Sequence, residues 1–360
     1  MAKHNTNITY TKAIGILLMV LCHAVTDSCR LIDSFVSMFH MPLFFFVSGY
    51  CFKEKYVQEP FRFVWQRIKG IWWPYIKWSL LFLALHNVFF DLNIYNGEYG
   101  YNGGVSSLYT YDDFLSRIES ILVRMNGHEQ LLGGYWFMKA LLYGSIIGFV
   151  IIFVSARIKT FNRLTVSLSG GVVVLIVCLW LNHEHRSLTI LHITPQLLLA
   201  SIFFLIGYWF KYKNVKTFNK TKIILSIILI AIGSVAWKMG MGAITYENSR
   251  MLPYIVTGTI GTWMLYSLPW DRIKGKFAYV LQFIGNNTLT ILTWHFLSFK
   301  FVSLLIIFIY GLPIERLAEF PVITEYSVKG WWLAYILFAM LATCGIAYCN
   351  RWIKSPWLKL

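Results

Sequence analysis

Ten runs of 16 to 23 mostly apolar residues are the feature that most constrains how this chain can fold. A helix needs about 20 residues to cross the hydrocarbon core of a bilayer. Hydrocarbon offers no partner to an exposed peptide group, so each run must be helical. A β-barrel would instead require alternating segments of about ten residues. The runs cover residues 8–26, 35–52, 72–90, 134–155, 164–181, 195–210, 223–238, 252–268, 287–309 and 331–348.

The composition supports a membrane protein. Hydrophobic residues make up 57% of the 360 positions and charged residues only 13%, whereas soluble domains average about 45–50% and about 25%. Aromatic pairs such as Trp72-Trp73 and Trp331-Trp332 border several runs, and Trp favours the membrane–water interface. We therefore predict an all-α integral membrane bundle of about ten transmembrane helices, which forms a single domain over residues 1–360.

The basic residues predict the orientation, because cytoplasmic loops collect Lys and Arg. With the N-terminus inside, 20 of the 32 Lys and Arg residues fall in inner segments and 7 in outer segments. Both termini are therefore expected in the cytoplasm. The net charge of +16 lies in short membrane-flanking loops, which argues against nucleic-acid binding.

The longest segment between the runs, residues 91–133, is expected on the outer side. Its first half, NIYNGEYGYNGGVSSLYTY, suits turns and offers hydroxyls and ring faces that could hold a sugar. Its second half, DDFLSRIESILVR, opens with an N-cap-like Asp pair and has apolar residues at helical spacing. It predicts a short helix on the outer membrane surface. The alternative is that the whole loop is only a solvated connector.

The cysteines and the loop histidines show no pattern that predicts a metal site. Six cysteines lie mostly within the runs and form no CxxC pair, which favours apolar fillers over ligands or disulfides. His183, His185 and His192 are accompanied by Glu184 alone. A hydrated loop is the favoured interpretation, and no bound metal is expected.

Ionisable residues at bilayer depth are expensive and are therefore functional candidates. Lys12 and His23 are eleven residues apart in the first run. At about 100° per residue this is three turns plus roughly 20°, so the two side chains share one helix face about 16 Å apart. They could line one passage. Alternatively, Lys12 snorkels to the interface and His23 is a satisfied polar residue.

Two further candidates lie in the second run. His40 is followed by Pro42, which should loosen the helix and free carbonyl groups nearby. Ser48 precedes Gly49, a pair that permits close helix approach.

The remaining candidates are distributed along the chain. Arg67 and Lys69 precede WWPY and suit ordinary cytoplasmic anchoring, and Trp136 suits the interfacial aromatic belt. His295 lies about two turns inside the ninth run, which Asn286 and Asn287 could cap. Lys300 follows five residues later, so it should face another side, with no partner that can be assigned.

Several of these residues fall in motifs that resemble the membrane acyltransferase type 3 family, whose members acylate cell-surface sugars. The resemblance covers residues 10–301. In order, the motifs are TKAIGILLMVLCHA, FHMPLFFFVSGYCF, QRIKGIWWPY, GYWFMKALL, FFLIGYW and IGNNTLTILTWHF. The family hallmark is an Arg followed eleven positions later by His. Here His23 matches, Lys12 stands in place of Arg, and Thr9 stands where an acidic residue is usual.

The resemblance implies a site for acyl transfer. His23 would be the catalytic residue, with Lys12 at the inner end and with His40, Ser48, Trp136 and His295 around it. Removing a hydroxyl proton suits an imidazole at neutral pH, although transient acylation of His23 is an alternative. The cations expected to meet the phosphates of acyl-CoA are Lys12, Arg67 and Lys69.

The predicted function is transfer of an acyl group, expected to be acetyl, from cytoplasmic acyl-CoA to a hydroxyl of a surface glycan or lipid-linked sugar. Acyl-CoA is then a co-substrate, no tightly bound cofactor is expected, and the location is the bacterial cytoplasmic membrane. One rival is a proton-coupled transporter or flippase of a glycolipid or polysaccharide, since buried His and Lys residues suit a carrier too. Another is a receptor that uses the outer loop.

Overall fold

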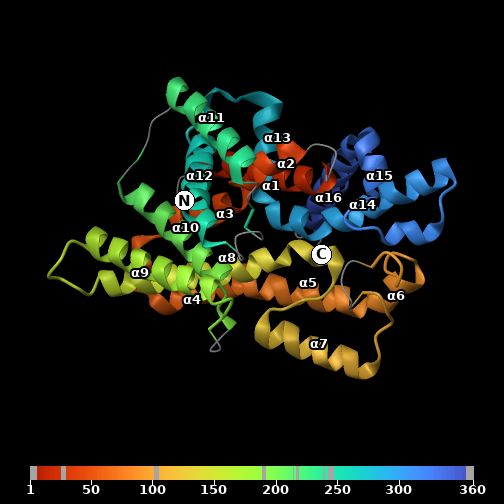
Figure 1. The fold of residues 1–360 in the computed structure, drawn as a ribbon, viewed down its shortest axis with the longest axis horizontal. Helices are drawn as coiled ribbons and strands as arrows, with labels where there is room; N and C mark the ends of the chain where they lie inside the picture. Colours follow the sequence, from red (N-terminus) through yellow and green to blue (C-terminus); the bar gives the residue numbers. More distant parts are fainter. Residues whose placement is uncertain are drawn as a thin grey trace. The chain divides into compact units, whose positions relative to one another are not determined.

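The computed structural model describes residues 6–25, 30–100, 105–188, 192–213, 215, 219–237, 240–241 and 247–353. Both chain ends, Cys29 and residues 101–104 lie outside these ranges. Within them the chain consists of helices and loops, with one isolated antiparallel bridge between Leu188 and Ile193 (Figure 1). The predicted all-α class is confirmed.

The helices follow the predicted apolar runs closely. In chain order they are α1 (Thr6–Val25), α2 (Arg30–Ser37), α3 (His40–Tyr50), α4 (Pro60–Arg67), α5 (Trp73–Ala84), α6 (His86–Asp91), α7 (Tyr111–Arg124), α8 (Trp136–Ser155), α9 (Arg163–His183), α10 (Pro195–Tyr212), α11 (Lys220–Trp237), α12 (Asn248–Tyr266), α13 (Gly275–Asn286), α14 (Thr288–Tyr310), α15 (Thr324–Tyr326) and α16 (Trp332–Ile353). Short 3₁₀ or π turns accompany them at η2 (Glu54–Val57), η3 (Ile68–Trp72), η4 (Gln130–Tyr135), η7 (Trp270–Arg272), η8 (Ile314–Ala318) and η9 (Ser327–Trp331).

Six helical stretches in the described part of the chain are long and apolar enough to cross a membrane. They are Thr6–Val25, Leu31–Tyr50, Gln130–Ser155, Arg163–His183, Thr288–Tyr310 and Thr324–Arg351. The prediction of a multi-pass membrane protein is therefore supported. The total of ten crossings and the cytoplasmic position of both termini stay predictions.

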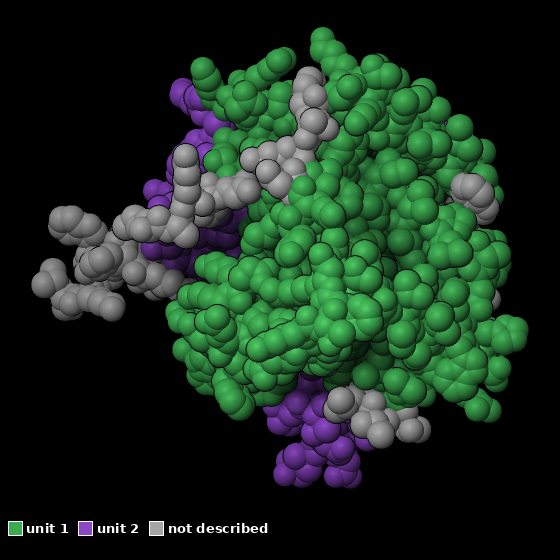
Figure 2. All heavy atoms as spheres, turned by 90° about the vertical axis from the view of Figure 1, so that its left-hand side faces the viewer, with its two compact units in different colours: residues 1–15, 34–74, 137–274 green, residues 16–33, 75–136, 275–360 purple. Residues whose placement is uncertain are grey.

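The chain forms two compact units, each assembled from three separate segments (Figure 2). Unit 1 contains residues 1–15, 34–74 and 137–274, and unit 2 contains residues 16–33, 75–136 and 275–360. The division falls within α1, α2, α5 and α8. Lys12 consequently belongs to unit 1 and His23 to unit 2.

Close packing of α3 against α10 organises unit 1. A Cβ atom on Gly49 would overlap the carbonyl group of Phe204, and one on Gly207 would overlap the carbonyl group of Phe46. Only glycine at both positions lets the two backbones approach this closely. The predicted close approach at Gly49 is confirmed.

In unit 2, α14 packs against α16, η4 and η8. A buried hydrogen bond of 2.8 Å between the hydroxyls of Ser303 and Tyr335 joins α14 to α16. Ser327 Oγ donates to the carbonyl of Ala24 at 2.6 Å and satisfies one of the unpaired carbonyl groups at the end of α1.

Three local expectations need correction. The break in the second run lies between α2 and α3, before His40, so that Pro42 sits in the first turn of α3, where proline is tolerated. Asn287 precedes α14 but does not cap it, because its amide reaches back to the carbonyl of Phe283 at 2.7 Å. Thr110, rather than the Asp pair, caps α7, and Asp113 completes the capping box.

Candidate active site

Helix α1 carries both residues of the expected hallmark. It is continuous from Thr6 to Val25, so Lys12 and His23 project from the same side of it. Both side chains are half-buried. The helix is therefore continuous over the eleven positions for which a shared face was predicted.

His23 faces His295, which lies 272 positions away in sequence on α14. The Nδ1 atom of His23 is 3.0 Å from Nε2 of His295. The two rings are stacked, with centroids 5.2 Å apart and planes inclined by 14°. His295 is fully buried. The structure therefore brings together two of the predicted site residues.

The hydrogen bonds around this pair define which nitrogen carries each proton. His295 Nδ1 lies 3.0 Å from the carbonyl oxygen of Leu292 and 3.2 Å from that of Ile291. Carbonyl oxygens only accept, so this nitrogen is the N–H donor. In a neutral ring Nε2 of His295 then accepts, and Nδ1 of His23 must donate to it. The lone pair of neutral His23 is consequently at Nε2.

Aromatic rings enclose the pair. The Phe296 ring centroid lies 4.7 Å from that of His23 and 3.9 Å from that of His295. Phe320 packs on the outer side of Phe296 at 4.6 Å. A ring packed on both imidazoles lowers their exposure to water, which strengthens the polar interaction between them. Sequence reasoning missed both phenylalanines, although Phe296 adjoins His295.

A second polar contact lies on the residues next to the histidine pair. Tyr135 and Thr293 join their hydroxyls at 2.7 Å, and both are buried. Trp136 follows directly at the start of α8 and is 40% exposed. An exposed indole at this point suits contact with a sugar ring or with the membrane interface.

His40 and Ser48 lie on α3 in unit 1. His40 Nδ1 is 2.9 Å from the carbonyl oxygen of Val36 and therefore donates to it. This bond bridges the break between α2 and α3. Ser48 Oγ is buried with no hydrogen-bond partner among the described residues.

The predicted donor-binding cations also belong to unit 1. Arg67 ends α4, with its guanidinium carbon 4.7 Å from the centroid of Phe63 and 6.0 Å from that of Phe204. Burial lowers the pKa of Arg67 to about 10, so it stays positive at neutral pH. Lys69 is exposed in η3, with its ammonium 4.9 Å from the ring of Trp65.

Further cations gather near Cys51, just after α3. Lys12, Lys211, Arg67 and Lys53 all lie close enough to act electrostatically on its thiol. Lys211 also donates a hydrogen bond to the carbonyl of Phe52. Nothing in the sequence around Lys211 signals that its side chain reaches residue 52.

His183, His185 and His192 do not belong to a metal-binding arrangement. Throughout the described ranges, no three His, Cys, Asp or Glu side chains are grouped so as to hold a metal ion.

Comparison with known proteins gives the family. No curated protein and no solved structure gave a significant match. A family model described as an acyltransferase domain, however, matches residues 5–356, which is nearly the entire sequence. With its histidine pair on two apolar helices, this chain belongs to the acyltransferase 3 family of membrane proteins.

Proposed function

We propose that the protein transfers an acyl group, expected to be acetyl, from cytoplasmic acyl-CoA to a hydroxyl of an outward-facing glycan or lipid-linked sugar. Membership of an acyltransferase family supports the reaction class. The single observation that carries the mechanism is the contact between His23 and His295. In a neutral pair it fixes which nitrogen of His23 carries the lone pair, and a general base requires such a positioned lone pair.

In the direct route, His23 Nε2 takes the proton of the acceptor hydroxyl while the hydroxyl oxygen bonds to the thioester carbonyl carbon. The resulting imidazolium keeps its Nδ1 proton on His295 Nε2. As the carbon–sulfur bond breaks, His23 returns the Nε2 proton to the leaving thiolate, which gives CoA thiol and the sugar ester. His295 orients His23 much as a third residue orients the base in other acyl-transfer sites.

The alternative route uses the same nitrogen as a nucleophile. Nε2 of His23 attacks the thioester carbon, the carbon–sulfur bond breaks, and CoA leaves as the thiolate. The sugar hydroxyl oxygen then bonds to the acyl carbon as the bond from that carbon to Nε2 breaks. The hydroxyl proton is released to water, which balances the proton that the CoA thiolate takes up. Rapid quenching followed by mass analysis of the peptide that contains His23 separates the routes, because only this one gives an acylated peptide.

The cations of unit 1 support an acyl-CoA donor. CoA carries several phosphate charges, and phosphates pair well with Arg and Lys side chains. Lys12, Lys53, Arg67 and Lys211 converge near Cys51. We assign this cluster to the donor phosphates.

The test uses the full chain in lipid nanodiscs with radiolabelled acetyl-CoA and membrane glycolipids. His23→Ala should lower the rate of acyl transfer by about 10²–10⁴-fold, the usual contribution of general acid–base catalysis, with unchanged binding of acetyl-CoA. His183→Ala, which alters a loop histidine, serves as the matched control and should retain full activity. Full activity of His23→Ala would overturn the mechanism. Glycolipid movement by the protein without acyl-CoA would instead support a transporter.

The acceptor can be identified separately. Mass spectrometry of surface glycans from cells with and without the gene should show a difference of one acyl group per modified sugar. The mass of that group identifies the acyl chain. Identical glycans in both strains would reject a glycan acceptor.

A further inference from the structure

Lys300 is a buried cation whose function the proposed reaction does not explain. It lies on α14, one and a half turns beyond His295, and its residue surface is 3% exposed. An ammonium group at membrane depth is costly and rarely occurs without a purpose. Its Nζ donates to the carbonyl oxygens of Leu317 at 2.8 Å and Glu319 at 2.7 Å.

These carbonyl groups belong to an irregular segment of residues 313–323, here called the strap. The strap contains η8 and continues to Ile323 before α15. Backbone that is not fully helical leaves carbonyl groups without intrahelical partners, and a buried location denies them water. Lys300 supplies two of the missing donors and ties the strap to the helix that carries His295.

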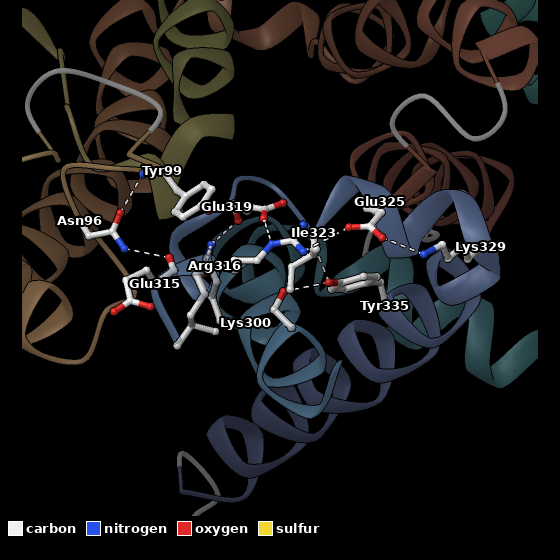
Figure 3. Close-up of polar contacts among 12 residues, drawn as sticks. Asn96, Tyr99, Lys300, Glu315, Arg316, Glu319, Ile323, Glu325, Lys329 and Tyr335 are labelled. Carbon is white, nitrogen blue, oxygen red and sulfur yellow. Dashed lines mark hydrogen bonds and ion pairs between the residues drawn. The ribbon is translucent and has the colours of Figure 1, made fainter. Parts of the chain in front are cut away.

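Other contacts hold the strap and the segment that follows it (Figure 3). Arg316 pairs with Glu319 at 2.5 Å and with Glu325 at 3.2 Å, and Lys329 pairs with Glu325 at 2.8 Å. The Ile323 amide donates to Tyr335 at 3.2 Å. These contacts tie the strap to itself, to α15 and to α16, whereas the Lys300 bonds tie it to α14.

The strap reaches the histidine pair through Phe320. This residue directly follows Glu319, whose carbonyl accepts from Lys300. The Phe320 ring packs on Phe296 at 4.6 Å, and Phe296 in turn contacts both imidazoles. Gly133 lies against the Phe320 ring, since a Cβ atom at this position would be 3.4 Å from the ring. A displaced strap would therefore free the Phe296 ring, which packs on both His23 and His295.

We propose that Lys300 is a positioning residue for acyl transfer, which fixes the strap so that Phe320 presses Phe296 against the His23–His295 pair. This inference rests on the proposed function. A catalytic pair tolerates little movement, because misplacement by about 1 Å can cost about 100-fold in rate. Lys300 touches neither imidazole, so it acts on the rate of the chemical step through the strap.

Steady-state kinetics of the full chain in nanodiscs test the proposal. Lys300→Met keeps the length of the side chain but removes both donated bonds. It should lower kcat by roughly 10–100-fold and leave the KM for acetyl-CoA within about twofold, since the donor cations belong to unit 1. Lys329→Met is the matched control: this exposed lysine pairs with Glu325 at the surface, and its loss should change kcat by less than about twofold.

Phe320→Leu keeps the Lys300 bonds and removes only the ring, so it tests the second link and remains informative if Lys300→Met fails to fold. It should also lower kcat with little change in KM. The double variant should be no slower than Lys300→Met alone, because both changes interrupt one chain of contacts. Independent, multiplying effects would overturn the proposal.

The outcomes are distinguishable from failure of the proposed function. If wild-type protein transfers acyl groups and His23→Ala does not, the function stands. Lys300→Met or Phe320→Leu with wild-type kcat per folded molecule, even with a lowered unfolding temperature, then shows that the Lys300–strap contact only supports the fold. If His23→Ala is fully active, the proposed mechanism fails first.

Discussion

The two units differ most in charge. Unit 1 holds 21 of the 32 Lys and Arg residues and 5 of the 16 Asp and Glu residues, whereas unit 2 holds 11 of each. The net charge of +16 therefore belongs to unit 1, and unit 2 is formally neutral. The net positive charge of the chain is thus carried by only one of its two units.

Several cations differ in their contacts between the units, although three arginines of unit 1 also pair with carboxylates, namely Arg62 with Glu59, Arg163 with Glu54 and Arg250 with Glu247. In unit 1, Arg67 and Lys69 lie over aromatic rings and Lys211 binds a backbone carbonyl, so their charges are not neutralised by those partners. In unit 2, carboxylates neutralise Arg316 and Lys329 directly. We interpret unit 1 as suited to a polyanionic donor and unit 2 as suited to proton transfer with a neutral sugar.

The largest effect on activity is expected for the residue that orients His23. His295→Leu removes the acceptor of the His23 Nδ1 proton and should lower kcat by about 10²-fold or more. His295→Gln places an amide oxygen near the former Nε2 atom and should recover much of this loss. The KM for acyl-CoA should not change in either variant. Equal kcat values for the two variants would contradict the tautomer assigned from the carbonyl contacts.

A large effect on stability is expected where α3 meets α10. Gly49→Ala would drive a methyl group into the backbone of Phe204 and should destabilise unit 1 by about 3 kcal/mol or more, at the upper end of overpacking effects. Thermal unfolding in detergent measures this. Gly70→Ala, whose added Cβ meets nothing within 4 Å, is the control and should unfold like the wild type. An unaffected Gly49→Ala protein would mean that the helices can separate freely.

An intermediate effect should separate donor binding from catalysis. Arg67→Gln removes a half-buried charge and should raise the KM for acyl-CoA by about tenfold with little change in kcat, as expected for a charge-assisted phosphate contact. Lys69→Gln alters an exposed cation two residues away and should raise KM by less than about twofold. A fall in kcat without a change in KM for Arg67→Gln would break the functional comparison between the units.

The smallest effect is expected in the loop of residues 91–133. Thr110→Ala removes the N-cap of α7 and should weaken this helix by about 1 kcal/mol, seen as faster amide exchange over Tyr111–Arg124, with kcat unchanged. The hydrogen bonds from Thr110 lower the pKa of Asp113, so this carboxylate stabilises the helix above its ordinary pKa near 4. That support should be lost as the pH falls below 4 in the wild type and be reduced at every pH in Thr110→Ala.

Much of the fold could be read from the sequence, and the exceptions have local causes. All ten apolar runs coincide with a helix or with two consecutive helices. The interruptions were harder to place: one lies just before His40, and the one at Leu85 has neither Gly nor Pro beside it. Asn287 was assigned a cap because its position suited one, but its amide donates to the carbonyl of Phe283, four residues earlier, a local alternative that the cap pattern does not distinguish.

The sequence predicted which residues belong to the candidate site, but it did not predict which of them contact one another. His23 and His295 were both candidates, and their mutual contact spans 272 positions. Lys300 had no assignable partner, because its acceptors are backbone carbonyls that carry no sequence signature. Phe320 had no signal at all, as one ring among 28 phenylalanines.

The sequence by itself determined that this chain forms apolar helices in a membrane and places Lys12 and His23 on one side of the first of them. The reason is that hydrocarbon forces each backbone group to pair within its own helix, and helical periodicity then sets which side chains share a face. Only the tertiary structure decided that His23 meets His295 and that Lys300 holds the strap. Periodicity states which way a side chain points, but the neighbour that it meets depends on how separate helices pack.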